Sequence, residues 1–325
     1  MRTLSTFVMY CSFTCRGGDS DCFEQIIKNV VLSNILITIT NIVIIFVEIK
    51  VLIKKVNIMN YLWILLAVSL AVSAVGWFYF IYFFSIGYGL SISALAVTSA
   101  IIFSDILTLP SAMLCGVLFV YGLRLAGYLF IREKKSASYK KILYQPDNTT
   151  KKPFFVMFMI WVSCALLYVG QVSPVSFYLF NIDGGDSPND IIAWIGSCVA
   201  LLGFTTETVA DAQKNKAKKV NSNRFVDSGL YKIVRCPNYF GEILMWTGCF
   251  IFCFAVCCSV WQWIIALLGY IGIVYVMFSG ARRIELRQNE TYGNDPEFKS
   301  YIKHTPIIIP FVPIYSVAKY SWLKA

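Results

Sequence analysis

The sequence has little of the polar chemistry from which most soluble enzymes build their sites. Only 14% of its 325 residues are charged, and His304 is its single histidine. One histidine excludes a site with several histidine ligands, and the eleven cysteines show no zinc-type paired spacing. The phosphate-binding pattern GxxxxGK[ST], the dinucleotide fingerprint GxGxxG and a Ser-His-Asp arrangement are also missing. The sequence therefore points away from metal sites and from soluble nucleotide-binding folds.

Apolar residues dominate instead. They make up 58% of the chain, and the mean hydropathy is +0.66. Runs long enough to cross a hydrocarbon core of ~30 Å recur along the chain. These predicted spans lie at 30–53, 59–84, 88–109, 111–131, 154–176, 190–210, 239–258 and 260–280. We predict an all-α fold, a polytopic transmembrane helix bundle with seven or eight spans.

The predicted organisation has three parts. Residues 1–29 form an N-terminal segment, and residues 30–280 form the transmembrane bundle with its cofactor loops. Residues 281–325 form a tail whose apolar, proline-broken stretch TPIIIPFVP predicts that it folds back on the bundle as a lid.

The charged residues predict the orientation of the bundle. The net charge is +10, and lysines and arginines gather in 132–153, in 211–237 and after residue 280. The loop 177–190 carries three aspartates and no basic residue. By the positive-inside rule the basic regions face the cytosol, and this loop faces the lumen or the exterior. Since topology accounts for much of the charge, we expect no nucleic-acid partner.

Three early lysines do not fit this alternation. Lys50, Lys54 and Lys55 lie between the first two predicted spans and also favour the cytosol. Either one early span is miscounted, or these side chains reach to a membrane interface.

A polar stripe follows the predicted span at 190–210. Glu207, Asp211, Lys214 and Lys218 are spaced i, i+4, i+7 and i+11, so they share one helix face. One interpretation is a solvated helix end, with ion pairs worth only ~0.3–0.5 kcal/mol each. However, the two carboxylates directly follow an apolar run, where a lone charge is costly. Carboxylates deep in the membrane with lysines nearer its surface suit a nucleotide, because carboxylates can accept from ribose hydroxyls or the adenine amine and lysines can bind phosphates.

The stretch RCPNYFGEIL, residues 235–244, places polar groups at the mouth of another span. Pro237 fits the first turn of a helix, so Arg235 stands just before the positive helix end, where an anion is favoured. Asn238 and Glu242 lie one turn apart on one face, with Tyr239 beside them. Interfacial anchoring explains Arg235 and Tyr239, but a carboxylate one turn into an apolar span needs a partner.

Two further places carry polar residues next to spans. Arg124, Tyr128 and Arg132 share a helix face near the end of the fourth predicted span. Asp105 lies near Pro110, which divides the pair of spans at 88–131. Snorkelling suffices for Arg132 and less well for Arg124, because a charged group inside a span usually faces the bundle interior.

These segments carry a resemblance to a known family. DAQK at 211–214, NRFVDSGLYKIVRCPNYFGE at 223–242, GLRLAGYLFIRE at 122–133 and the tail resemble the steroid 5-alpha-reductase-like membrane family, in its DUF1295 branch. The resemblance covers roughly residues 90–315. It implies an integral protein of the endoplasmic reticulum or another internal membrane. Members use NADPH to reduce a carbon–carbon double bond in a sterol, steroid or similar lipid, with the cofactor site facing the cytosol.

The resemblance also implies roles for individual residues. The residues expected to bind the cofactor are Glu207, Asp211, Lys214, Lys218, Arg224, Arg235, Asn238, Glu242, Arg283, Tyr292 and Tyr301. Glu207 is a candidate through the polar stripe alone, and the others through the resemblance. Among them, the lysines and Arg224 are candidates for the 2′-phosphate. Tyr239, Asp105 and Tyr128 are the candidate catalytic acids. One departure is Cys236, which stands where the family has histidine. An element that places a steroid enone is also missing, which leaves the substrate open.

Two other functions stay open. Membrane methyltransferases of the isoprenylcysteine or phospholipid type share a similar Arg-His-Pro element and use S-adenosylmethionine. The Asn238 and Glu242 positions and the upstream ADAQK helix favour the reductase, and the tail has Glu285 and Glu290 but no adjacent pair. Cys236 in place of histidine motivates the other alternative, a lipid-binding membrane protein without catalytic activity.

Overall fold

The computed structural model describes residues 58–135 and 153–323. The chain divides into the units Met1–Lys55 and Val56–Ala325, and the description below concerns the second unit. The predicted N-terminal segment 1–29, the predicted span 30–53 and the three early lysines lie outside the described residues. The same holds for the lysines of the 132–153 region that fall between 136 and 152.

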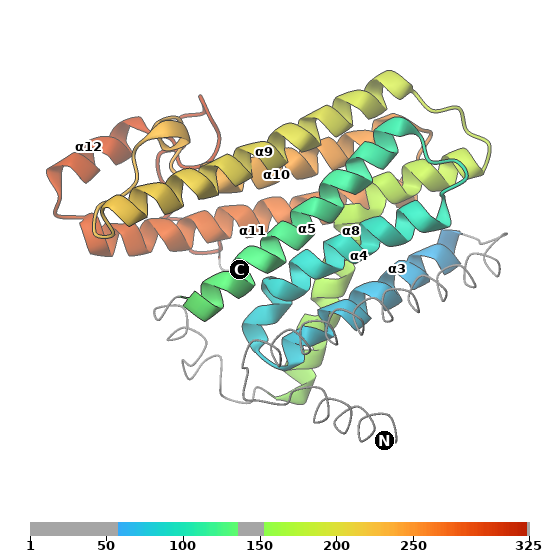
Figure 1. Cartoon of the computed structure of the whole chain (residues 1–325), viewed down its shortest axis with the longest axis horizontal. Coiled ribbons are helices and arrows are strands. Elements are labelled where there is room, and N and C mark those ends of the chain that lie inside the picture. The colour runs from blue at the N-terminus through green and yellow to red at the C-terminus, as the bar shows by residue number, and fades with distance from the viewer. Residues whose placement is uncertain (1–57, 136–152, 324–325) are drawn as a thin grey trace, which may run out of the picture. The chain divides into compact units, whose positions relative to one another are not determined.

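The second unit is a bundle of long helices (Figure 1). Its α-helices are α3 (Ile58–Ser73), α4 (Ile86–Ile102), α5 (Leu109–Lys135), α8 (Phe154–Asp183), α9 (Asp190–Val220), α10 (Pro237–Ile251), α11 (Val260–Tyr292) and α12 (Pro296–His304). Short 3₁₀ turns lie at Ala74–Trp77, Phe80–Phe84, Gly229–Lys232 and Phe252–Phe254. The described residues contain no strand, so the predicted all-α class is confirmed.

Six of these helical stretches are long and apolar enough to cross a membrane. The chain is therefore an integral, multi-pass membrane protein. The predicted span 239–258 is the shorter helix α10, 15 residues long, followed by a 3₁₀ turn. The predicted span 59–84 is too long: α3 and its 3₁₀ extension end at Trp77, and the next span begins at Phe80. Hydropathy missed this break because residues 78–84 are themselves mostly apolar.

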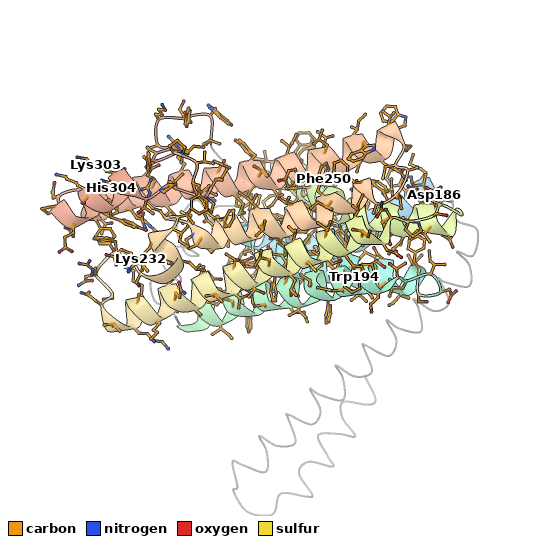
Figure 2. The ribbon with its side chains drawn as sticks, turned by 90° about the horizontal axis from the view of Figure 1, so that it is seen from above. Asp186, Trp194, Lys232, Phe250, Lys303 and His304 are labelled. Atoms are coloured by element: carbon orange, nitrogen blue, oxygen red, sulfur yellow. The ribbon has the colours of Figure 1, made fainter. Side chains whose placement is uncertain are left out.

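Helices α9 and α11 are longer than a bilayer requires. They contain 31 and 33 residues, whereas about 20 residues span the hydrocarbon core. The excess lies toward their C-terminal turns, which carry the polar residues. Figure 2 shows Lys232, Lys303 and His304 at this end, and Asp186 at the other. We call these the basic end and the acidic end; the predicted segregation of basic regions 211–237 and 281–303 from the loop 177–190 is confirmed.

Helix α9 packs directly against α10, because small residues line their contact. A Cβ atom on Gly203 would lie 2.2 Å from the backbone nitrogen of Met245. One on Gly248 would lie 2.3 Å from the backbone nitrogen of Ala200. Glycine is therefore required at both positions, and the two backbones meet directly, as in other small-residue contacts between membrane helices. This contact holds the polar residues of α9 against those of α10.

The tail after α12 returns along α11. The backbone N–H groups of Arg235 and Cys236 donate to the carbonyls of Pro306 and Ile307, at 2.8 and 2.9 Å. Ile307, Ile308, Val317 and Leu323 form a small apolar cluster with Cys236 and Ala281. The tail thus covers one face of α11 and the start of α10.

Candidate ligand-binding site

A cavity of about 120 Å³ opens at the basic end. It lies between the last turns of α9, the loop that follows, the start of α10 and the last turns of α11. Its lining residues are Lys214, Lys218, Phe225, Val226, Tyr231, Arg235, Cys236, Asn238, Ile284, Arg287, Gln288, Thr291 and Tyr292. The sequence predicted five of these as site residues: Lys214, Lys218, Arg235, Asn238 and Tyr292.

The lining is strongly positive. Four cations reach it, Lys214, Lys218, Arg235 and Arg287, and no Asp or Glu is among the lining residues that the structure describes. Arg235 is 3% exposed, and its Nε and Nη1 atoms have no hydrogen-bond partner. A buried guanidinium with two unsatisfied donors is costly. The positive charge of the lining favours an anionic ligand.

Arg235 is held from behind by the tail and α11. Its Nη2 donates to Glu285 Oε1 at 3.0 Å and also to the carbonyl oxygen of Tyr315. The other carboxylate oxygen of Glu285 accepts the backbone N–H of Val317 at 2.8 Å. The Arg235 and Glu285 side chains are 1% and 3% exposed, so this is a fully buried ion pair. It fixes the guanidinium, whose Nε and Nη1 atoms have no hydrogen-bond partner among the described residues.

Lys218 bridges the cavity between α9 and α11. Its Nζ donates to the hydroxyl of Tyr292 at 3.0 Å and to the carbonyl of Ser222 at 3.0 Å. Gln213 fixes the neighbouring loop, because its side-chain oxygen accepts the backbone N–H of Leu230 at 2.8 Å. Lys218 therefore ties α9 to α11 at the cavity.

The Cys236 thiol in the cavity lining is neutral. Burial raises the pKa of Cys236 to about 11, against the smaller opposing effect of Arg235. Burial likewise raises the pKa of Tyr231 and of Tyr301 above the usual range of a phenol. The charge of the cavity therefore comes from its lysines and arginines.

Deeper along α9 the sign of the charge changes. Arg124 of α5 forms ion pairs with Glu207 and with Asp211, the latter at 3.1 Å. The Glu207 side chain is 5% exposed, and its Oε2 atom has no hydrogen-bond partner. Asp211 and Glu207 lie roughly 5 and 11 Å along the helix from Lys214. The predicted stripe of deep carboxylates and shallow lysines is confirmed, and Arg124 is the cation that compensates it.

Glu242 has the partners that its position in the sequence required. Its Oε1 accepts hydrogen bonds from Tyr88 of α4 at 2.9 Å and from Tyr121 of α5 at 2.8 Å. Trp246 donates to the Tyr88 hydroxyl at 3.1 Å. We call Tyr88, Tyr121, Glu242 and Trp246 the carboxylate cluster. Glu242 lies one helical turn beyond Asn238, which lines the cavity, so the cluster is the inner neighbour of the cavity along α10.

This cluster predicts different effects for two substitutions. Glu242→Leu leaves two buried phenol groups without their acceptor and should lower the free energy of unfolding by about 1–3 kcal/mol. Glu242→Gln keeps an amide oxygen in the same place and should change it by less than about 1 kcal/mol. Chemical unfolding of the purified protein in one detergent measures both. Equal losses in the two variants would show that the phenols do not depend on this acceptor.

Several predicted residues lie outside the cavity and the cluster. Asp105 is exposed in the loop between α4 and α5, toward the acidic end, so the structure does not bring it to the other candidates. Arg283 is exposed and does not line the cavity. Arg224 is exposed and forms ion pairs with Asp227 and Glu297 instead of lining the cavity. Hydropathy and spacing showed only that these residues adjoin spans or loops, not which way they face.

Three further candidates lie beside the site. Tyr301 stacks on Phe225, a lining residue, with ring centroids 5.4 Å apart, and donates to the carbonyl of Tyr231 at 2.7 Å. Tyr128 donates to the side-chain oxygen of Asn215 at 3.3 Å. Tyr239 packs against Gly280 of α11.

The sequence also missed residues that the structure brings to the site. Tyr88 lies in the stretch GYGLSISA, which has no polar pattern that marks it, and its partner Glu242 is 154 residues away. Arg287 and Gln288 share a helix face with Ile284 and Thr291, at i, i+3, i+4 and i+7. That spacing is a signal by which the cavity face of α11 is found.

A family model matches the part of the sequence that contains these residues. The model of a family described as "Protein of unknown function (DUF1295)" matches residues 82–305. The chain belongs to the DUF1295 family. No curated protein and no solved structure matched in the other two comparisons. The DUF1295 match is close to the range 90–315 expected from the sequence, and it includes every lining residue and the whole carboxylate cluster.

Proposed function

We propose that this DUF1295 protein is a membrane-embedded reductase that uses NADPH to reduce a carbon–carbon double bond in a lipid. The resemblance to the steroid 5-alpha-reductase-like family motivates the reaction type. We propose the endoplasmic reticulum or another internal membrane as its location, with the basic end in the cytosol, where NADPH is present. A sterol, a steroid or another enoyl lipid would be the substrate.

One observation carries the proposal. The cavity has four cations and no carboxylate among its described lining residues. Phosphate groups are the ligands that such a lining favours, because charge-assisted hydrogen bonds from arginine and lysine are strong. NADPH carries three phosphates, so the lining fits this end of the cofactor.

The same charge disfavours the methyltransferase. S-adenosylmethionine carries a sulfonium cation and no phosphate, and a lining of four cations repels it. The reductase is therefore the better match to the electrostatics of the cavity.

The cavity volume limits what this conformation accommodates. About 120 Å³ holds a phosphate or a ribose, whereas pockets for drug-sized ligands occupy about 300–1,000 Å³. Binding of the whole cofactor therefore requires the cavity to widen. The contact between Lys218 and Tyr292 is the one that must open, since it joins α9 and α11 directly.

The chain supplies the remaining requirements of the reaction. The bound nicotinamide would supply a hydride to one carbon of the double bond. Arg235, the two lysines and Arg287 would hold the phosphates at the basic end. A phenol would donate the proton to the adjacent carbon: Tyr239 adjoins Asn238 on α10, and Glu242 orients the hydroxyls of Tyr88 and Tyr121.

Ligand-dependent thermal unfolding tests the proposal. Purified protein in nanodiscs is heated with NADPH, NADH or S-adenosylmethionine at equal concentration. We expect NADPH to raise the midpoint most, since a ligand at 100 times its Kd adds about 2.7 kcal/mol to stability. Inorganic pyrophosphate is the control for nonspecific anion binding and should shift the midpoint less than NADPH.

Two outcomes would contradict the proposal. A clear shift with S-adenosylmethionine and none with NADPH would favour the methyltransferase. A shift with pyrophosphate as large as that with NADPH would show an anion site without nucleotide recognition, as in a catalytically silent protein.

A further inference from the structure

The tail presents an apolar outer surface. The Phe311 side chain is 96% exposed and Trp322 is 66% exposed; Val312, Tyr315 and Tyr320 are exposed as well. Phe311 lies between Pro310 and Pro313 and has a φ of 63°, in the left-handed region that a phenylalanine rarely adopts. Such strain persists where the surroundings stabilise it, and it directs this ring outward.

This surface continues the lipid-facing stripe of α11. Ile264, Leu268 and Ile271 are exposed on one face of that helix, at i, i+4 and i+7. The same spacing continues to Tyr275 and Arg282, but there the tail covers the helix. Tyr275 donates to the carbonyl of Trp322 at 3.0 Å, and Arg282 donates to that of Ala318 at 3.1 Å. The tail therefore lies where lipid would otherwise contact α11.

The segment after α12 contacts α11 near the depth at which the helix leaves the membrane. About 20 residues of α11 from Val260 span the hydrocarbon core, so Tyr275 lies within its edge near the basic end. The Tyr275 and Trp322 rings stack, with centroids 6.1 Å apart. Tryptophan and tyrosine favour this layer. Lys319 is exposed on the same segment and lies 5.1 Å from the centre of the Tyr320 ring, which suits contact with anionic headgroups.

The segment after α12 lies away from the cavity. Ile284, Arg287, Gln288 and Thr291 face the cavity, whereas Tyr275 and Arg282 lie on a roughly opposite face of α11, as about 100° of rotation per residue requires. No residue after α12 is among the described residues that line the cavity. Instead the inner side of the tail binds the Arg235–Glu285 ion pair, through the carbonyl of Tyr315 and the backbone N–H of Val317.

We propose that residues 311–322 insert into the interfacial layer of the leaflet at the basic end, and that this membrane contact holds Arg235 and Cys236 in place. The partner is the bilayer itself. The proposal does not depend on the identity of the cavity's ligand.

Photocrosslinking tests the membrane contact. A benzophenone amino acid replaces Phe311 in one preparation and His304 in a control, in nanodiscs of phosphatidylcholine and phosphatidylserine. His304 is exposed at the same end, on α12. We expect lipid adducts at position 311 and at least tenfold fewer at position 304, measured by mass spectrometry. Equal yields, or no adduct at position 311, would overturn the insertion.

Alkylation of Cys236 tests the second part. Its thiol is buried, and its backbone N–H is bound to the tail. Phe311→Asp should release the tail from the bilayer and raise the rate of maleimide modification of Cys236 at least tenfold. Val220→Asp makes the same change at a position that is 85% exposed at the end of α9, and should leave the rate unchanged. An unchanged rate in Phe311→Asp would overturn the holding role of the tail, whatever the adducts show.

Discussion

Replacing Arg124 with methionine is expected to lower the free energy of unfolding by about 3–5 kcal/mol. Arg124 faces two carboxylates inside the bundle, and the Glu207 side chain is only 5% exposed. Without the guanidinium, two negative charges about one helical turn apart stay buried without compensation. The loss should therefore exceed that of an ordinary surface ion pair several-fold, and denaturant unfolding in a single detergent measures it.

Arg224 provides a matched control. It too forms ion pairs with one aspartate and one glutamate, Asp227 and Glu297, but its side chain is 44% exposed and theirs are 37% and 67%. Arg224→Met should leave the free energy of unfolding nearly unchanged, because water screens this exposed group. Removing both carboxylate charges in Arg124→Met, with Glu207→Gln and Asp211→Asn, should restore part of the stability. Equal losses in Arg124→Met and Arg224→Met would show that the inner carboxylates are not ionised.

The double substitution Lys214→Met with Arg287→Met is expected to weaken NADPH binding by about 100-fold. Each side chain lines the cavity from a different helix, α9 and α11. A hydrogen bond to a charged group is worth about 1.5–3 kcal/mol, so losing two costs about 3 kcal/mol or more. That corresponds to two factors of ten in Kd, which calorimetric titration of the purified protein measures.

Arg283→Met is the control for this experiment. Arg283 is one helical turn from Arg287 on α11, but it is exposed and does not line the cavity. Its removal changes the net charge of the protein by the same amount as Arg287→Met. We expect less than a twofold change in Kd. A loss equal to that of Arg287→Met would mean that long-range attraction, rather than contact in the cavity, accounts for the binding.

The sequence predicted those features that depend on local patterns. Apolar length identified the helices, and i, i+4 spacing placed Glu207, Asp211, Lys214 and Lys218 on one face of α9. Positive charge predicted which loops share an end of the bundle. In each case the decisive information lies within one helix or one loop, where period and composition are sufficient.

Contacts between distant segments were not predictable in the same way. That Glu242 needs a partner followed from its apolar surroundings, but nothing in the pattern named Tyr88 or Tyr121. The Arg235–Glu285 pair joins residues 50 apart, and its geometry depends on how α10, α11 and the tail meet. Arg283 and Arg287 lie one turn apart on α11, yet only Arg287 lines the cavity, and that difference becomes known only when the neighbouring helices are placed.

The glycine contact between α9 and α10 has a mechanical consequence. Two backbones that meet without intervening side chains leave little room for sliding or rotation, so α9 and α10 move as one rigid body. This rigid pair of helices carries Lys214, Lys218 and Asn238, which therefore keep their positions relative to one another. Any widening of the cavity must then come from its opposite wall, α11 and the loop that ends at Arg235. The movable wall of the cavity is thus the one formed by α11 and this loop, which is also the wall in contact with the segment after α12.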